Sequence, residues 1–270
     1  MQLQTIDKIK VLQFENLLDK HLLHFTTTRL GGTSKGNYES LNLGNLSDDK
    51  PENVYENRRR LVHAIKAPVD KIFIPHQTHS NNIRIINADF LQLPEEEQRL
   101  KLENIDALIT NQPHVAIGIT TADCVPIIIF DPQKKVLAAI HAGWKGTISH
   151  IAMKTIKVMT KEFDCIPQHL LAGIGPSISP EKFEVGDEVG TAFEKSGFNL
   201  DNISFRNKNT CKLHIDLWKA NEIELVNAGL SISHIQIARI CTMSNPDLFF
   251  SARRQTINSG RMLTGGIILS

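Results

Sequence analysis

The sequence predicts a single mixed α/β domain that spans residues 1–270. Short apolar runs typical of strands alternate along the chain with longer segments of helical periodicity. No internal repeat, low-complexity tract or polar linker divides these segments into separate units. With 41% hydrophobic and 22% charged residues, the composition is that of a globular protein with a substantial core. One mixed α/β domain is the simplest architecture that accommodates these observations.

The predicted strands are short runs rich in Val, Ile, Leu and Phe, bounded by turn-forming residues. Only residues 131–135 separate two of them, which indicates a hairpin. In chain order the expected strands are Ile9–Phe14, Leu22–Arg29, Ile72–Ile74, Ile83–Ile86, Ala107–Thr110, Val115–Thr120, Val125–Phe130, Val136–His141, Leu170–Ile174, Ile232–Ile240 and Met262–Leu269.

The first predicted helix runs from Pro51 to about Ala67. Asp48 or Asp49 can cap it, Pro51 suits its first turn, and Pro68 stops it. Apolar residues then recur at mostly helical spacing in three later segments. These further expected helices follow Gly146 as far as Phe163, and occupy Gly186–Lys195 and Ile215–Ala228.

The charge balance and the termini exclude several classes of partner. The formal net charge is +1, from 30 basic and 29 acidic residues, so no global field attracts nucleic acid or an anionic membrane. The most apolar stretch, Val115–Phe130, carries Asp123 and is too short to span a bilayer. Because the N-terminus also lacks a signal segment, we expect a soluble protein without nucleic-acid or membrane partners.

The cysteines favour a reducing compartment. Four of them are scattered along the chain without a Cys-x-x-Cys pair, which fits neither a zinc finger nor a secreted disulfide scaffold. We therefore expect a cytoplasmic protein, while the sequence leaves its oligomeric state open.

The strongest chemical signal is the pair Cys124 and His141, at the two ends of the predicted hairpin. The hairpin is symmetrical about Pro132 and Gln133, which would set the thiol and the imidazole opposite each other on neighbouring strands. Directly opposed residues have Cβ atoms about 4.5 to 5.5 Å apart. The two side chains could therefore bind one metal ion or form a Cys/His catalytic couple.

A catalytic zinc site needs a third protein ligand and one open position. The segment Ile74–Ser80 offers His76 and His79. In a strand, residues three apart point to opposite faces, so only one of the two could reach the ion. The spacing alone does not choose between them.

Two motifs flank the hairpin, Thr-Ala-Asp-Cys-Val-Pro at 121–126 and His-Ala-Gly-Trp-Lys-Gly at 141–146. They resemble the paired signature of the bacterial laccase-domain family, also called multicopper polyphenol oxidase-like. The resemblance extends over nearly the full length of the chain. Further similar segments are Phe25–Ser34, Leu41–Gly44, Gly173–Pro176, Phe183–Gly186, Ser251–Arg254 and Gly260–Arg261.

The resemblance implies a His, a Cys and a His as metal ligands, with the first histidine in a Gln-Val-His-Gly-like segment. Gln-Thr-His-Ser at 77–80 matches that segment, which selects His79 and departs from it at Thr78 and Ser80. His79, Cys124 and His141 are thus the implied metal ligands and catalytic residues.

The resemblance further implies a multilayer α/β/β/α sandwich with mixed sheets and a bound Zn²⁺. Family members with zinc catalyse phosphorolysis of adenosine, inosine, guanosine and methylthioadenosine, and hydrolytic deamination of adenosine. Purine nucleosides and phosphate are therefore the expected partners. With 11 histidines and no His-x-His pair, the chain lacks the imidazoles of a true multicopper oxidase, although Cu²⁺ could still occupy the single site.

The two implied reactions make different demands. For deamination, zinc lowers the pKa of bound water towards ~7, which supplies a hydroxide for C6 of the purine. Asp123 is a candidate proton shuttle because it adjoins a ligand, although on a strand it would point away from Cys124. Phosphorolysis instead requires a phosphate oriented at the ribose C1′.

Three residues are predicted to bind substrate. Arg29, with the glycine-containing loop that follows it, could bind an anion. Arg58 follows Asn57 in a pair that resembles an Asn-Arg pair of the family, and Asn42 could bind ribose or base. Further anion-binding candidates are Arg253, Arg254 and Arg261.

Three other functions remain open. The first is a copper-dependent, polyphenol oxidase-like activity. In the second, Cys124 is a nucleophile and His141 its base, as in metal-free hydrolases or deamidases, and chelation would spare that reaction. The third is a non-enzymatic regulator with a structural metal site, which predicts four closed ligand positions and unfolding on metal removal.

Overall fold

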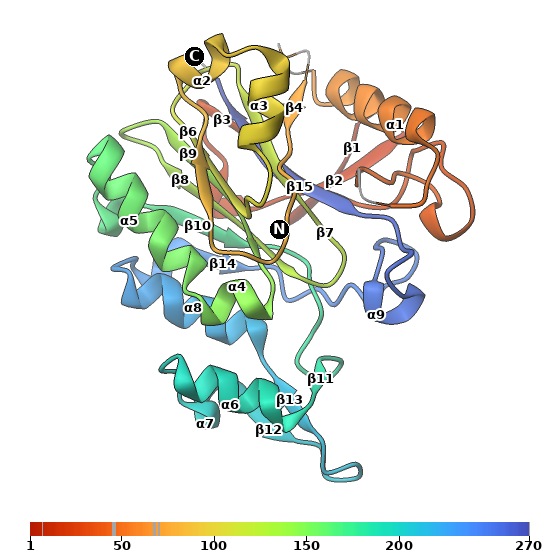
Figure 1. The fold of residues 1–270 in the computed structure, drawn as a ribbon, viewed down its shortest axis with the longest axis vertical. Coiled ribbons are helices and arrows are strands. Elements are labelled where there is room, and N and C mark those ends of the chain that lie inside the picture. The colour runs from red at the N-terminus through yellow and green to blue at the C-terminus, as the bar shows by residue number, and fades with distance from the viewer. Residues whose placement is uncertain (7, 45–46, 67–68, 70, 270) are drawn as a thin grey trace.

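The computed structural model describes residues 1–6, 8–44, 47–66, 69 and 71–269. Two large sheets stack face to face, and helices lie on the outer side of each (Figure 1). This arrangement confirms the expected mixed α/β/β/α sandwich. A search of the described helices for one long and apolar enough to cross a membrane finds none.

The first sheet has the strand order β1-β2-β3-β15-β7-β4. Its neighbours pair antiparallel except β4 and β7, which are parallel. The last strand therefore lies between an early and a middle strand, which joins distant parts of the chain. The strands are β1 (Gln2–Ile6), β2 (Ile9–Gln13), β3 (Leu22–Thr27), β4 (Ile72–Phe73), β7 (Ala116–Thr121) and β15 (Met262–Ile268).

The second sheet has the order β14-β10-β8-β9-β6-β5 and is also mixed. Its central hairpin, β8 and β9, is buried at every position, because both of its faces are covered. The strands are β5 (Ile83–Ile85), β6 (Ala107–Thr110), β8 (Val125–Asp131), β9 (Val136–Ala142), β10 (Leu171–Ile174) and β14 (Ile235–Ile237).

Alternation along the β8–β9 hairpin builds two cores. Phe130 and Leu137 point between the sheets, where they join Ile117 of the first sheet. Ile127 and Ile140 point the other way, into the core beneath the helices. The period of two in each strand thus supplies side chains to both cores.

The helices are α1 (Pro51–Ala64), α2 (Ala88–Gln92), α3 (Glu95–Lys101), α4 (Trp144–Ile148), α5 (Ile151–Phe163), α6 (Asp187–Lys195), α7 (Leu200–Ile203), α8 (Leu217–Asn227) and α9 (Ala252–Gln255).

A small third sheet lies outside the two main layers, at the lower end of Figure 1. It comprises β11 (Glu184–Val185), β13 (Leu213–Ile215) and β12 (Ser204–Arg206), in that order. Its strands of two or three residues are too short to leave a sequence pattern, and the sequence predicted none of them.

The start of α1 tests the predicted capping. The helix begins at Pro51 as expected, whereas its expected end near Ala67 and Pro68 lies outside the described residues. The predicted aspartate cap is wrong, because Lys50 is the N-cap and no side chain caps the helix. The Asp49 carboxylate instead accepts a hydrogen bond from the Ser34 hydroxyl at 2.6 Å.

The β8–β9 hairpin also corrects a prediction, because His141 lies opposite Pro126 and not opposite Cys124. The turn shifts since the Asp131 carboxylate accepts hydrogen bonds from two loop N–H groups. One step beyond the last pair, Cys124 faces Gly143, so Cys124 and His141 are diagonal neighbours. Diagonal neighbours share a face of the sheet, and the two side chains still meet.

Candidate metal centre

Three side chains with metal-binding atoms converge at one end of the second sheet. The donor atoms of His79, Cys124 and His141 all lie within 4.8 Å of one another. Sγ of Cys124 is 3.7 Å from Nε2 of His79, and the two imidazole centroids are 4.9 Å apart. His141 is buried while His79 is exposed, so the group opens on one side.

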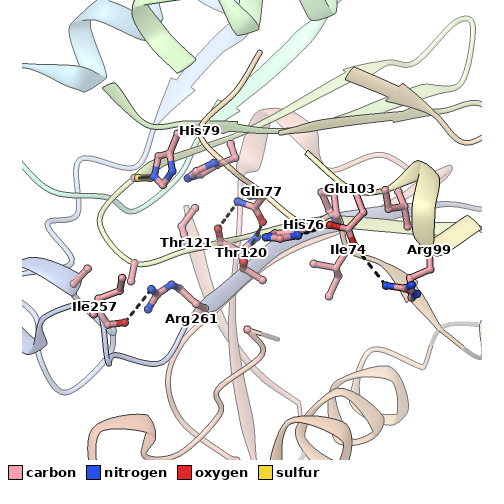
Figure 2. Close-up of a pocket in the computed structure, with 17 residues that line it drawn as sticks. Ile74, His76, Gln77, His79, Arg99, Glu103, Thr120, Thr121, Ile257 and Arg261 are labelled. Atoms are coloured by element: carbon pink, nitrogen blue, oxygen red, sulfur yellow. Dashed lines mark hydrogen bonds and ion pairs between the residues drawn. The ribbon is translucent and has the colours of Figure 1, made fainter. Parts of the chain in front are cut away.

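The structure brings His79, and not His76, to this group. The segment between β4 and β5 is a loop in which His79 has a φ of 62°, so strand alternation does not apply to it. Nδ1 of His76 instead contacts the Glu103 carboxylate, further along the same cavity (Figure 2).

Asp106, which no sequence motif indicated, holds two of the three residues. Its carboxylate is fully buried and lies 2.7 Å from Nδ1 of His141. The same carboxylate accepts hydrogen bonds from the backbone N–H groups of Thr78, His79 and Ser80. Asp106 therefore orients one imidazole directly and the other through its backbone.

The charges within the group favour a thiolate beside an imidazolium. Burial raises the pKa of Cys124, but the charge of His141 and hydrogen bonds to both histidines lower it to about 6. Burial lowers the pKa of His141, but the Cys124 thiolate and the Asp106 carboxylate raise it to about 9. A thiolate is the form of cysteine that binds metals and attacks electrophiles.

Both carboxylate oxygens of Asp123, next to the thiol, accept hydrogen bonds from the protein. Asp123 accepts hydrogen bonds from the hydroxyls of Thr242 and Ser251 at 2.6 and 2.9 Å, and from the backbone N–H of Arg253 at 2.7 Å. Its φ of 86° turns the chain just before Cys124. Asp123, the candidate proton shuttle, thus connects Thr242, Ser251 and Arg253 to the turn that precedes Cys124.

A cavity of about 640 Å³ opens beside the three donors. Gln77 forms part of its wall. The Gln77 side-chain oxygen accepts a hydrogen bond from the Thr120 backbone N–H, and the side-chain nitrogen donates to the Thr120 carbonyl, each at 2.8 Å. Figure 2 shows Arg261 beside Ile257, toward the end of the lining residues that holds His79, and Arg99 at the other end. The remaining lining residues include the apolar side chains of Ile74, Leu102, Ala252 and Ile257.

The three predicted substrate-binding residues do not line this cavity. The Arg29 guanidinium donates to backbone carbonyls of Glu39 and Pro246, and Arg58 donates to the Leu43 carbonyl. Burial lowers the pKa of Arg58 to about 10. These contacts stabilise loops, and the predicted contacts with substrate stay predictions.

Asn42 is also engaged within the protein. Its Oδ1 accepts hydrogen bonds from the N–H groups of Gly44 and Arg261, at 3.1 and 2.9 Å. Its Nδ2 donates to Ser47 and Asp49. Asn42 therefore reaches the cavity indirectly, because both Gly44 and Arg261 line it.

The donor set fits zinc. One thiolate and two imidazoles are typical zinc ligands, and catalytic zinc sites combine three protein ligands with an open position. The cavity beside the exposed His79 provides space for that position. The imidazole-carboxylate contact at Asp106 is the usual support of a metal-binding histidine.

Comparisons with known proteins place this site in context. Residues 23–269 match the family described as multi-copper polyphenol oxidoreductase laccase. The chain is 43% identical to a purine nucleoside phosphorylase of Bacteroides thetaiotaomicron over 98% of each chain. It is 40% identical to adenosine deaminase RL5 of an unknown prokaryotic organism, over 89% of this chain and 92% of that protein. The crystal structure of YlmD from Geobacillus stearothermophilus has a TM-score of 0.89 and 28% identity, covering 99% of this chain and 98% of that one.

Proposed function

Because the chain belongs to the multi-copper polyphenol oxidoreductase laccase family, we propose that it is a zinc-dependent purine nucleoside phosphorylase that also deaminates adenosine. The observation that carries the proposal is the convergence of His79, Cys124 and His141 beside a substrate-sized cavity. The names of the two relatives support the two reactions.

His79, Cys124 and His141 would hold the zinc ion, which when bound supplies a Lewis acid at the cavity wall. Asp106 keeps the His141 proton on Nδ1, so that Nε2 faces the other donors. It also holds the backbone of the loop that carries His79. The ligands are thus pre-oriented before substrate arrives.

The cavity suits a purine nucleoside. Its volume of about 640 Å³ lies within the range of roughly 300 to 1,000 Å³ that is typical of small-molecule sites. Ile74, Leu102 and Ile257 offer apolar surface for a base, and the wall at Gln77 and Thr120 is polar. We propose adenosine, inosine, guanosine and methylthioadenosine as its substrates.

A metal analysis combined with a nucleoside assay tests the proposal. Purified protein with one equivalent of zinc should release free base from inosine in phosphate buffer and ammonia from adenosine. Cys124→Ser should lose both the metal and the two activities. In contrast, His76→Ala should keep the metal, because His76 is paired with Glu103 and lies outside the donor group.

Two results would refute the proposed function. One is a zinc-loaded wild-type protein that forms neither product. The other is full activity in Cys124→Ser, since that variant lacks the only thiol of the donor group. Loading with copper must be measured as well, because copper binds such nitrogen and sulfur donors more tightly than zinc.

A metal-free cysteine hydrolase is the second candidate, and one observation favours it. Cys124, His141 and Asp106 form a chain in which a carboxylate orients an imidazole beside a thiolate of lowered pKa. This is the arrangement of a cysteine nucleophile with its base and orienting group. Chelation separates the candidates, since it should abolish the zinc-dependent reactions and spare a cysteine hydrolase.

A further inference from the structure

Two arginines line the cavity, and they differ in how their charge is balanced. Arg99 is exposed and pairs with the carboxylates of Glu96 and Glu103. For Arg261, no carboxylate of the described residues lies within 4.0 Å of its guanidinium. Arg261 is therefore the arginine of the cavity wall without a carboxylate in direct contact. The charges of Cys124 and Asp123 raise its pKa from a greater distance, and burial lowers it overall.

The Arg261 guanidinium also has donors left over. Nη1 donates to the Ser259 carbonyl and hydroxyl at 2.5 and 2.7 Å and to the Gly260 carbonyl at 3.1 Å. Nη2 donates to the Ile257 carbonyl at 3.3 Å. Within the described residues, Nε has no acceptor and Nη2 has one. In a guanidinium, the N–H of Nε and one N–H of Nη2 point in the same direction. The edge formed by Nε and Nη2 can therefore bind two oxygens of one anion.

The backbone around Arg261 is held by a buried network. Its N–H donates to Oδ1 of Asn42, and its carbonyl accepts from the N–H of Leu43. The Leu43 carbonyl is in turn bound by Arg58 at 2.7 Å. A Cβ at Gly44 would lie 2.6 Å from Cγ of Arg261, so the glycine lets the side chain pass. These contacts fix the position from which the guanidinium extends.

We propose that Arg261 binds the phosphate co-substrate of phosphorolysis through the Nε and Nη2 edge of its guanidinium, an inference that rests on the proposed function. The planar fork matches two phosphate oxygens, and Arg261 stays protonated at neutral pH. Asn42 and Arg58 are then positioning residues, which act through the backbone of residues 43 and 261.

The reaction that this arrangement serves is balanced without another reactant. An oxygen of hydrogen phosphate forms a bond to the ribose C1′ as the bond from C1′ to the purine nitrogen breaks. The purine leaves with the electron pair of that bond, and the proton of hydrogen phosphate ends on the base. The products are ribose 1-phosphate and the free purine. Deamination of adenosine consumes water and requires no phosphate, so it should not depend on Arg261.

This difference supplies the test. In zinc-loaded Arg261→Gln, the KM for phosphate in inosine phosphorolysis should rise on the order of 10- to 100-fold, the effect of losing one charge-assisted bidentate contact. Adenosine deamination by the same preparation should stay within about threefold of wild type, because it uses no phosphate. Retained deamination also reports that the variant folds and holds its metal.

A second variant keeps the test decisive if Arg261→Gln does not fold. Arg261→Lys keeps the charge but loses the planar fork, so its KM for phosphate should rise by a smaller factor while deamination persists. The matched control is Arg59→Gln, which removes an exposed arginine that pairs with Glu56 outside the cavity. It should change neither reaction.

A binding measurement without turnover completes the test. Calorimetric titration with inorganic phosphate should show a site in wild type that Arg261→Gln weakens by the same factor as its KM. Three results would overturn the assignment. The first is an unchanged KM for phosphate in Arg261→Gln, and the second is an equal loss of both reactions in both Arg261 variants. The third is a raised KM for phosphate in Arg99→Gln in place of the Arg261 variants. A wild-type protein without either activity would refute the proposed function first, which is a distinguishable result.

Discussion

Asp106 shows how much of the candidate metal centre depends on a residue that is not itself a donor. Its two carboxylate oxygens face N–H groups of the His79 loop and the ring of His141. Charge-assisted hydrogen bonds of this kind are about twice as strong as neutral ones. They outweigh the burial that raises its pKa, so the pKa of Asp106 is lowered overall.

The first prediction is that Asp106→Asn weakens zinc binding about 10- to 100-fold, as loss of a partner of a metal-bound histidine does. An amide cannot accept all of these hydrogen bonds, because its nitrogen is a donor. Competition with a chromogenic chelator measures the affinity. The control is Asp131→Asn, another buried aspartate with backbone N–H partners, but one in the β8–β9 turn. Equal zinc affinity in both variants and wild type would contradict the role of Asp106.

The second prediction concerns the pH dependence of the metal-free thiol. We expect alkylation of Cys124 by iodoacetamide to rise with a midpoint near pH 6, the pKa of its thiol in the folded protein. The measurement uses a Cys211→Ser background, which removes the exposed thiol, and peptide mass spectrometry. In His141→Gln the midpoint should move upwards, because the charge that lowers the pKa is gone. A wild-type midpoint near 9 would exclude the thiolate.

The same shifts have a consequence for folding stability. The folded pKa of Cys124, about 6, is below its ordinary 9.0, so its contribution is complete above pH 9 and is lost as pH falls through 6. The folded pKa of His141, about 9, is above 6.5, so its contribution is complete below pH 6.5 and is lost as pH rises through 9. Both contributions are therefore present together between about pH 6 and 9.

Among elements, the junction of β9 and α4 brings its backbone close to the donors. Gly143 is the N-cap of α4, and its φ of −64° is open to any residue. A Cβ there would lie 2.9 Å from Sγ of Cys124 and 3.1 Å from Cδ2 of His79. Glycine is thus required at this position for space and not for backbone conformation.

The third prediction is that Gly143→Ala lowers zinc affinity at least about tenfold, because Cys124 or His79 must move to admit the methyl group. Chelator competition again gives the affinity, and urea unfolding of the metal-free protein gives the stability. Gly190→Ala is the matched control, since its Cβ would meet Cδ2 of Leu213 at 2.6 Å, far from the donors. Unaltered zinc binding in Gly143→Ala would show that the thiol has more room than the structure gives it.

The elements also show why the sequence predicted the hairpin but not its register. Apolar residues specify the faces of β8 and β9, whereas the turn depends on the Asp131 side chain and the loop backbone, which periodicity does not reveal. Similarly, the single helix expected after Gly146 is divided into α4 and α5 by His150, which has a φ of 59°. A residue with left-handed backbone angles ends a helix without changing the periodicity of the apolar residues around it.

For the whole molecule, most strands and the three donors could be predicted, whereas the residues that support the donors could not. Short apolar runs marked every strand of the two large sheets except β1. Asp106 reaches the donors, and Arg261 reaches the cavity, only through tertiary pairing. Asp106 immediately precedes β6, where a polar residue bounding an apolar strand is the one signal that could have identified it. Arg261 immediately precedes β15, which lies beside β7 only because the C-terminal strand enters the middle of the first sheet.

The fourth prediction is that zinc stabilises the folded protein, because the three donors come from parts of the chain that belong to different sheets. His79 lies in the loop that leaves β4 of the first sheet, whereas Cys124 immediately precedes β8 and His141 lies in β9 of the second sheet. A bound ion would therefore link the two layers. At a free zinc concentration of about 100 times the Kd, the free energy of unfolding should increase by about 2.7 kcal/mol. For a chain of this size, that corresponds to a rise in Tm of roughly 5 to 10 °C. Calorimetry with and without zinc measures the shift, which should be lost in His79→Ala and kept in His76→Ala. An equal shift in His79→Ala would mean that zinc stabilises the fold from another site, and the link between the two sheets through these donors would be wrong.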